Sequence, residues 1–504
     1  MAHLRHFAAV PVIVVLMGGS AHAALTADQI WQSWKDGATL VGLNITAATE
    51  SNSGGVLTLN GISIAPAGET RAFTISDLTL TENADGTVAI APGDAIGADF
   101  GTAEEGGKIA VTHDGLSLVA KEGGNGGIVY DYSAAKLDLT YDFTAPGYSF
   151  DESQPAEPGK ENGTIGFQDL SGQYSDTPGD NRTFGLTLAA AKLIYDISSD
   201  QPAFGMKTAQ TSETDSITIG GEFVLPSGIA LGEIDSAAEF GEALQQGLSV
   251  KLNSTQGVSK GTASQQDMFL PYDMVMEAGA GTADLLFNKD VFSLTSKGDG
   301  GFTMDITTPA SPAPVKISMD TIEMNLLSPV MSGETAGDYG MVLKLGQLVL
   351  NDEVWGMFDP GAALKREPFD LAVDLAGKAK VDWIAMMVAD ETGGPAVVPE
   401  PESLNINQMA LKLAGAALDA TGALTFDNTA GFPAPLGEAT VNISGADQLI
   451  NGLIATGILS EDDAMMARMM MGGFMVPGSE PDTLTSKVEF KEGFQIFANG
   501  QQIQ

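Results

Sequence analysis

Apolar and polar residues alternate along much of the chain, from about residue 42 to residue 224 and again in the second half. The clearest alternation lies between Lys136 and Phe143. A period of two places the apolar side chains of a strand on one face and the polar side chains on the other. The pattern therefore predicts antiparallel sheet with one face in water. The apolar positions of this segment are Leu137, Leu139, Tyr141 and Phe143.

Turn and breaker residues divide the predicted strands. Asp85-Gly86 and Asp114-Gly115 are each flanked by apolar or β-branched residues, which predicts two hairpin turns. The alternation changes phase at Ser76-Asp77, which predicts a β-bulge at that point. The segments 151–163 and 390–403 are rich in proline and glycine, so we expect them to be loops.

Helix signals are few. Thr26 and Gln29 have the spacing of a capping box, which predicts a short helix near residue 30. A second helix is expected from about Ile234 to Gln246, with an apolar inward face. Near the C-terminus, cap signals at Ser444 and Ser460 precede two apolar periodic segments, which predicts a helical hairpin.

Together these patterns predict an α+β fold that is mostly long antiparallel β-sheet, with a few packed helices and a C-terminal helical hairpin. We expect a signal peptide at 1–23 and an N-terminal β-rich half at 24–230. A central helix plus β region at 231–395 and a C-terminal β plus helical-hairpin region at 396–504 follow. Residues 24–504 could equally be one continuous unit.

The first 23 residues have the three parts of a secretory signal. Arg5 supplies the positive charge, residues 7–17 are apolar, and Ala21-His22-Ala23 is a small-x-small cleavage site. No later segment reaches about 18 consecutive apolar residues, so no transmembrane helix is expected after cleavage. The sequence predicts a periplasmic protein cleaved after Ala23.

The composition narrows the chemistry. The chain has 65 acidic and 24 basic residues, a formal net charge of −41, no cysteine and 4 histidines. This acidic balance argues against nucleic-acid binding, which requires a basic surface. Cysteine-based catalysis, thiolate metal sites and disulfides are excluded. Three histidines lie in the signal, so only His113 would remain, beside a predicted turn where a solvated side chain is expected.

Two short motifs resemble nucleophile motifs, and neither has the surroundings that the chemistry needs. Ser259 lies in a G-x-S-x-G string, but no histidine follows it to act as its base. Ser133 and Lys136 form an S-x-x-K string that leads into the predicted strand instead of opening a helix. The sequence therefore predicts no catalytic residue, no metal site and no cofactor. Acidic pairs are too abundant to identify a carboxylate-dependent site.

The second C-terminal helix is the least ordinary local feature because it is rich in methionine. Methionine fills irregular cores and lines adaptable apolar grooves, and its thioether can also bind Cu(I). The i, i+1, i+4, i+5 spacing is typical of a buried helical face, which favours a core or a groove over copper. The ligand-groove candidates are Met465, Met466, Met469, Met470 and Phe474.

Three sequence blocks resemble one family. They are LTADQIWQSW after the signal, residues 355–377 with WGMFDP and REP, and a C-terminal block that includes 423–429, 445–475 and ANGQQIQ. The chain is similar there to the exported Gram-negative family catalogued as domain of unknown function twenty-one twenty-five. The resemblance implies periplasmic residence and a large continuous unit. It transfers no catalytic residues, because the family carries no established activity.

Three functional hypotheses follow. The first is a non-enzymatic periplasmic binding protein of the cell envelope, whose sheet holds an apolar or lipid-like ligand. The second is a hydrolase that acts through carboxylates, and the third is a purely structural protein-binding module. The lack of histidine, cysteine and supported nucleophile motifs favours the non-enzymatic readings. The partner is unknown, with a lipid or an envelope protein as the expected classes.

Overall fold

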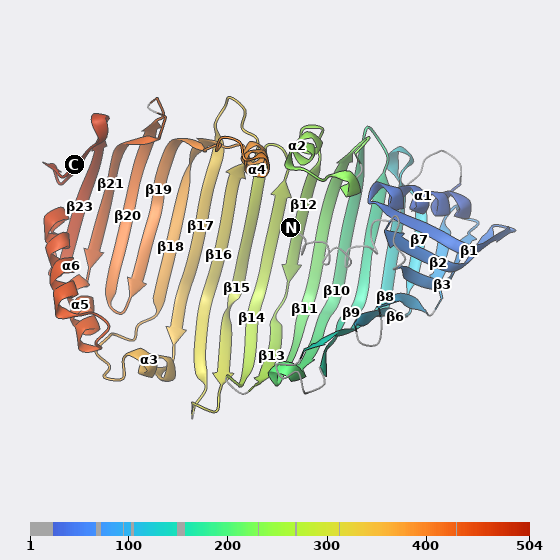
Figure 1. The fold of residues 1–504 in the computed structure, drawn as a ribbon, viewed down its shortest axis with the longest axis horizontal. Coiled ribbons are helices and arrows are strands. Elements are labelled where there is room, and N and C mark those ends of the chain that lie inside the picture. The colour runs from blue at the N-terminus through green and yellow to red at the C-terminus, as the bar shows by residue number, and fades with distance from the viewer. Residues whose placement is uncertain are drawn as a thin grey trace. The chain divides into compact units, whose positions relative to one another are not determined.

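The computed structural model describes residues 24–66, 72–93, 95–101, 105–148, 157–229, 231–267, 270–311, 313–429 and 431–504. The predicted signal and its cleavage site after Ala23 lie outside these residues. The chain divides into two compact units, Met1–Asp273 and Met274–Gln504 (Figure 1). The regions expected from the sequence, with limits at 230 and 395, stay predictions.

The first unit opens with a helix that packs on a small sheet. α1 (Ala27–Leu40) has the predicted capping box, since Thr26 and Gln29 bond each other's backbone N–H. Its apolar face buries Ile30, Trp31 and Trp34. The strands beside it are β1 (Leu43–Ser53), β2 (Val56–Pro66), β3 (Phe73–Glu82), β4 (Val88–Pro92) and β5 (Ile96–Gly101).

Long antiparallel strands make up the rest of this unit. A second helix, α2 (Ala237–Gln245), begins at a Ser236 capping box, as predicted for this region. The strands are β6 (Gly106–Asp114), β7 (Ser117–Glu122), β8 (Ile128–Tyr148), β9 (Glu157–Thr177), β10 (Asn181–Gln201), β11 (Met206–Pro226), β12 (Ser249–Gln256) and β13 (Ser259–Gln266). The predicted loop at 151–163 is wrong in its last part, because β9 already begins at Glu157.

One of the two predicted hairpins is confirmed and the other is wrong. Asp85-Gly86 joins β3 to its partner β4. Asp114-Gly115 joins two strands that both pair with β8 in one continuous register, Asp114 opposite Lys136 and Ser117 opposite Ser133. The chain therefore runs straight on at Gly115, whose φ of +63° interrupts the strand without reversing it.

The apolar face of this sheet continues past such interruptions. Asp169 in β9 and Ser216 in β11, the two strands that flank β10, also have positive φ. Beyond them the apolar residues stay on the same side, because Leu137 and Phe167 pack with the buried Ala134. The register changes by one residue opposite Ser76-Asp77, but the extra residue lies between Pro92 and Ile96, so the bulge predicted in β3 is found on the facing strand segment instead.

The second unit is an antiparallel sheet in which successive strands pair in sequence order from β15 to β21. β23 then pairs with β21, and β22 and β24 pair with different parts of β23. The strands are β14 (Tyr272–Phe287), β15 (Val291–Thr307), β16 (Val315–Pro329), β17 (Gly337–Leu350), β18 (Phe369–Lys380), β19 (Glu400–Leu413), β20 (Ala416–Asp427), β21 (Ala434–Ser444), β22 (Val476–Pro477), β23 (Thr483–Lys491), β24 (Gln495–Ala498) and β25 (Gln501–Gln502). The predicted, predominantly antiparallel architecture is confirmed.

Four helices interrupt this series of strands: α3 (Asp352–Phe358), α4 (Trp383–Thr392), α5 (Ala446–Ala455) and α6 (Glu461–Phe474). Figure 1 shows α3 and α4 at opposite ends of the strands, and α5 and α6 beside β21 and β23. The two helices predicted near the C-terminus are therefore present, while their arrangement as a hairpin stays a prediction. Part of the predicted loop at 390–403 is likewise helix or strand.

Candidate functional site

Register places a continuous row of apolar residues across the second sheet. Residues directly opposite each other in neighbouring strands project from the same face. Following the pairs from β15 to β24 gives nine positions without a polar side chain. This first row is Leu294, Leu326, Met341, Leu375, Ile406, Gly422, Ala439, Val488 and Ala498.

Two further rows lie on the same face, two residues along each strand, displaced only by bulges. The second row is Ser296, Met324, Leu343, Val373, Met409, Ala420, Val441 and Ser486. The third row is Gly298, Ile322, Leu345, Leu371, Leu411, Leu418, Ile443 and Leu484. We call these 25 positions the apolar rows. Only Ser296 and Ser486 among them are polar.

The opposite face of the same strands is polar. Lys344, between Leu343 and Leu345, pairs with Glu323 at 3.2 Å. Asn407 donates a hydrogen bond to Asp374 at 2.8 Å. The sheet therefore keeps its apolar rows on one face and these charged side chains on the other.

The apolar rows are accessible at three of their positions. Ile322, Met341 and Met409 are 44%, 37% and 39% exposed. The described strands of 274–504 belong to one hydrogen-bonded sheet. Its helices lie at the strand ends and at one edge (Figure 1). With neighbouring strands about 4.8 Å apart and alternate residues about 6.8 Å apart, the rows extend roughly 38 Å across the strands and roughly 14 Å along them.

Aromatic side chains flank the rows at the end near α4. The Trp383 indole donates to the Ser328 hydroxyl at 3.0 Å, and Ser328 lies opposite Phe292 on the apolar face. The Tyr339 hydroxyl donates to the Ser403 carbonyl oxygen at 3.1 Å. Trp383 is 45% exposed, so an indole face borders the rows.

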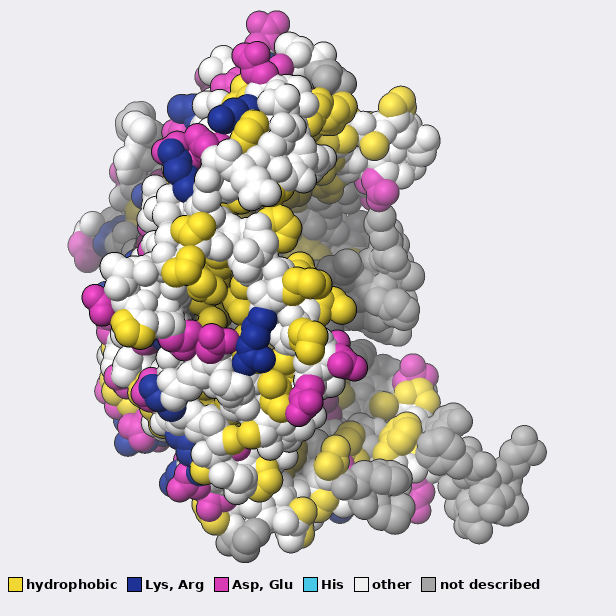
Figure 2. Space-filling view, turned by 90° about the vertical axis from the view of Figure 1, so that its left-hand side faces the viewer, with side chains coloured by type: hydrophobic (Ala, Val, Ile, Leu, Met, Phe, Trp, Pro, Cys, Tyr) yellow, Lys and Arg dark blue, Asp and Glu magenta, His cyan; other side chains and the backbone are white. Residues whose placement is uncertain are grey.

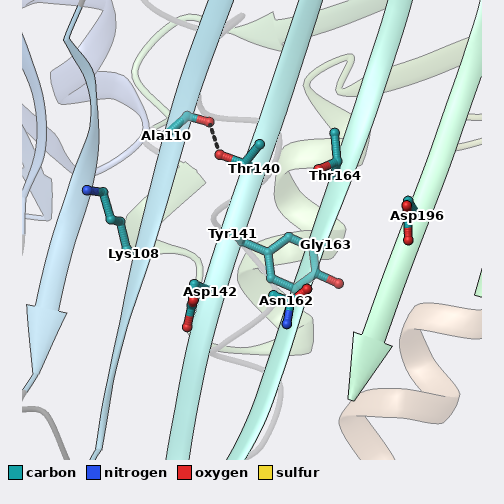
Figure 3. A pocket seen from close by; sticks show the side chains of 9 residues that line it. All are labelled: Lys108, Ala110, Thr140, Tyr141, Asp142, Asn162, Gly163, Thr164 and Asp196. Carbon is teal, nitrogen blue, oxygen red and sulfur yellow. Dashed lines mark hydrogen bonds between the residues drawn. The ribbon is translucent and has the colours of Figure 1, made fainter. Parts of the chain in front are cut away.

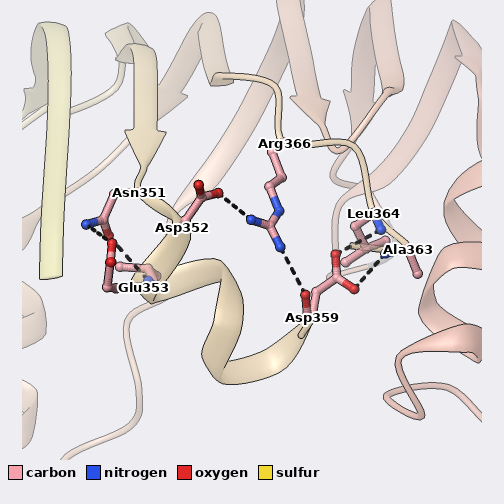
Figure 4. A network of polar contacts seen from close by, with 8 residues as sticks. Asn351, Asp352, Glu353, Asp359, Ala363, Leu364 and Arg366 are labelled. Atoms are coloured by element: carbon pink, nitrogen blue, oxygen red, sulfur yellow. Dashed lines mark hydrogen bonds and ion pairs between the residues drawn. The ribbon is translucent and has the colours of Figure 1, made fainter. Parts of the chain in front are cut away.

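A rigid polar cluster lies at the other strand ends, where α3 follows β17 (Figure 4). Asp359 is fully buried, and its carboxylate accepts hydrogen bonds from the backbone N–H groups of Ala363 and Leu364 at 2.8 and 2.9 Å. Arg366 donates to the Asp359 carbonyl at 3.2 Å and pairs with Asp352. The WGMFDP and REP elements therefore fold a tight connection, and their role here is structural.

Comparison with family models identifies this part of the chain. Residues 290–495 match a family described as "Uncharacterized protein conserved in bacteria (DUF2125)". The predicted resemblance is thus confirmed for residues 290–495. No curated protein matches the chain. The LTADQIWQSW block lies outside the matched residues, while the apolar rows and the Asp359 cluster lie almost entirely inside them.

The methionine-rich helix of the matched region does not bury the residues expected to be buried. Met465, Met466, Met469 and Met470 are each more than half exposed, and Phe474 is 44% exposed. The inward side of α6 instead carries Ala464, which is fully buried, and Arg468, which donates to Asp447 and Asn451 of α5. Figure 2 shows hydrophobic side chains scattered among charged ones on this side of the molecule. The methionine spacing predicted a buried face of α6, but the face that the structure buries is the one that carries Ala464.

The residues examined as nucleophiles lie in strands of the first unit. Ser259 begins β13, and its hydroxyl lies within hydrogen-bonding distance of the Ser212 and Thr214 hydroxyls, at 3.3 and 3.0 Å. Ser133 is inside β8, as the alternation predicted, and not at a helix start. His113 is opposite Leu137, and its buried Nε2 finds no partner among the described residues, so the expectation of a solvated turn histidine is wrong.

A shallow polar hollow of about 390 Å³ lies on β6, β8, β9 and β10 of the first unit (Figure 3). Lys108, Asp142, Asn162 and Asp196 line it, while the Tyr141 ring lies over Gly163 beside it. No histidine or serine lines this hollow. Within the described residues, no group of three histidine, aspartate or glutamate side chains could hold a metal ion.

A buried ion pair beside α1 went unnoticed in the sequence. Arg182 donates two hydrogen bonds to the fully buried Asp176 carboxylate, at 2.8 and 2.7 Å. Burial raises the pKa of Asp176, although the guanidinium opposes the shift. Above them the Trp34 indole donates to the Tyr130 hydroxyl at 3.3 Å. Asp176 lies near the end of β9 and Arg182 near the start of β10, and a spacing of six residues is not a sequence pattern that predicts an ion pair. The pairing of β9 with β10 brings the two side chains together.

Among the residues that the structure describes, no helix combines the length and the apolar composition needed to cross a bilayer.

Proposed function

We propose that the protein is a non-enzymatic binding protein of the periplasm, and that the apolar rows of its second unit hold an apolar, lipid-like ligand. The supporting observation is the unbroken extent of the rows: 23 of 25 positions are apolar or glycine, and Ile322, Met341 and Met409 are each more than one third exposed.

The size of this surface calls for an occupant. An area of roughly 38 by 14 Å is on the order of 500 Å², and soluble monomers seldom expose larger contiguous apolar patches without a function. A sheet face of this kind is covered by helices, by a second sheet or by a ligand. The helices of this unit lie at the strand ends and at one edge, which leaves the ligand as the covering layer.

We place a helical hairpin of α5 and α6 at the β23 end of the rows. Five residues connect the helices, and Arg468 joins α6 to Asp447 at 3.0 Å. The Ser486 hydroxyl, in the second row, donates to the Phe474 carbonyl at the end of α6 at 2.7 Å. The exposed methionines would then lie beside the end of the rows, where flexible thioether side chains adapt to ligands of varied shape.

Periplasmic residence is part of the proposal. It rests on the ordered signal regions of residues 1–23 and on the small-x-small site at Ala21-His22-Ala23. N-terminal sequencing of the periplasmic fraction is expected to begin at Ala24, and an intact Met1 terminus retained in the inner membrane would contradict this.

The binding role is tested by placing charge in the rows. Met341→Glu and Met409→Glu each add a carboxylate to an exposed apolar position, which an apolar ligand must desolvate. Val342→Glu and Gln408→Glu add the same charge to the adjacent residue on the opposite face. Titration with Nile red, an uncharged fluorophore, should show saturable binding that the first pair weakens at least tenfold and the control pair leaves unchanged.

Two results would contradict the proposal. One is an absence of saturable binding by wild-type protein with a native near-ultraviolet circular dichroism spectrum. The other is equal loss of binding in both pairs of variants.

A protein-binding module is the second candidate, favoured by the exposed methionines of α6. It predicts that a partner protein protects these methionines from oxidation while Nile red binding is absent.

A further inference from the structure

The second unit is strongly acidic, and its Lys and Arg side chains are all paired with carboxylates. Residues 274–504 contain 31 acidic and 12 basic side chains. All 12 basic side chains lie in the described residues, and each has a carboxylate oxygen within 4.0 Å. They are Lys289, Lys297, Lys316, Lys344, Lys365, Arg366, Lys378, Lys380, Lys412, Arg468, Lys487 and Lys491.

The apolar rows therefore offer no unpaired Lys or Arg side chain to an anionic head group. Carboxylates and phosphates are recognised by free Arg and Lys side chains or by built backbone sites. An anionic lipid on the rows would find no cation beside it, because Lys297, Lys344, Lys412 and Lys487 alternate with row residues and project from the opposite face. It would also bind to a unit whose net charge has the same sign. Screening acts over about 8 Å at physiological ionic strength, and the rows are only about 14 Å wide, so the surrounding acids act on any bound head group.

We infer that the apolar rows select an uncharged molecule with long hydrocarbon chains, of the kind represented by a diacylglycerol. This inference rests on the proposed function and specifies its ligand. The rows extend roughly 38 Å, longer than the hydrocarbon core of a whole bilayer at about 30 Å, so they accommodate more than the length of one acyl chain. Their roughly 14 Å width admits chains lying side by side.

A second copy of the chain fits these observations less well. Face-to-face association of the rows would bring together two acidic chains, each with a net charge of −41. Like-charge juxtaposition disfavours such a complex at low and moderate ionic strength. Concentration-independent mass in light scattering is therefore expected, and a dimer that excludes the neutral probe would overturn the inference.

The test uses three fluorescent lipids with the same acyl chains and different head groups: a diacylglycerol, a phosphatidic acid and a cationic lipid. The full chain after signal removal should bind the diacylglycerol at least tenfold more tightly than the phosphatidic acid at low salt. Added salt should narrow this ratio by improving phosphatidic acid binding. The Met341→Glu variant should weaken binding of the diacylglycerol, whereas Val342→Glu should not.

Charge variants sharpen the result. Asp338→Asn and Asp305→Asn each remove one acid from an exposed pair and so lower the net negative charge of the unit. Phosphatidic acid should then gain affinity severalfold, while diacylglycerol affinity stays the same. Equal or tighter wild-type binding of phosphatidic acid would overturn the inference and leave the binding role standing. Binding of none of the three lipids, together with no Nile red binding, would overturn the proposed function itself.

Discussion

The Tyr339 ring lies across Gly377, its direct partner in the neighbouring strand. A β-carbon on Gly377 would lie 2.7 Å from Tyr339 Cε1 and 2.1 Å from the Ser403 carbonyl oxygen. The tyrosine hydroxyl donates to that same carbonyl at 3.1 Å. Glycine thus allows the aromatic ring of β17 to lie over the backbone of β18 and its hydroxyl to reach β19. This contact links three strands at the border of the apolar rows.

Gly377→Ala should therefore destabilise the second unit by about 2 kcal/mol or more, since neither the ring nor the backbone carbonyl can move away without breaking the hydrogen bond. Gly356→Ala, inside α3 with open space around the added carbon, is the matched control and should be neutral or stabilising by up to about 1 kcal/mol. Urea denaturation followed by tryptophan fluorescence measures both. Equal midpoints for the two variants would show that the Tyr339–Gly377 contact is not tight.

The buried Asp359 carboxylate gives a second prediction. Asp359→Ala leaves two backbone N–H groups without their acceptor, so the expected loss is on the order of 3 kcal/mol. Asp352→Ala removes an 82% exposed partner of Arg366 and should cost less than about 1 kcal/mol. The same denaturation experiment applies, and comparable small losses in both variants would contradict the structural role assigned to the family motif.

Alkaline pH should weaken the protein through its tyrosines. Burial raises the pKa of Tyr132 and Tyr141 to about 12, and it also raises the pKa values of Tyr130, Tyr174 and Tyr339. A folded-state pKa above the unfolded value near 10 favours the neutral phenol in the fold. The resulting stabilisation is complete below pH 10 and is lost as the pH rises from 10 towards 12.

Phenolate absorbance measures this effect. Of the eight tyrosines, at least these five should titrate above pH 10 in native protein and near pH 10 in urea. Titration of all eight near pH 10, with circular dichroism still native, would contradict the buried environments described.

The Asp176–Arg182 pair predicts an effect with a defined pH dependence. Arg182→Ala leaves a buried carboxylate without its cation, which typically costs about 3–5 kcal/mol. Because loss of the guanidinium removes the interaction that opposes the raised pKa of Asp176, the carboxyl should protonate more readily and the cost should be smaller at pH 4 than at pH 7. Asp176→Asn combined with Arg182→Ala should recover part of the loss. A cost that grows on acidification would have the wrong sign.

Local patterns predicted local structure well. Thr26 caps a helix as expected, and the alternation in β8 identified a strand with one apolar face. The hairpin predicted at Asp114-Gly115 was wrong, because a glycine with positive φ occurs both in hairpin turns and at interruptions within a strand. The distinction lies in the pairing of β6 and β7 with β8, which is not local.

The candidate site could be predicted only in part. A strand pattern shows that an apolar face exists, but the three rows depend on the register of nine strands. The methionine spacing of α6 did not show which side would face inward. Ala464 and Arg468 occupy that side, since a small residue allows close approach and Arg468 bonds Asp447 and Asn451.

The central claim is that the apolar rows contact the ligand. Photolabelling with a diacylglycerol that carries an alkyl diazirine, followed by peptide mass spectrometry, tests it most directly. The account predicts saturable labelling at row positions such as Met324, Leu343 and Met409, competed by unlabelled diacylglycerol, with little label on Lys344 or Gln408 of the opposite face. Equal labelling of both faces, or labelling confined to the first unit, would contradict it.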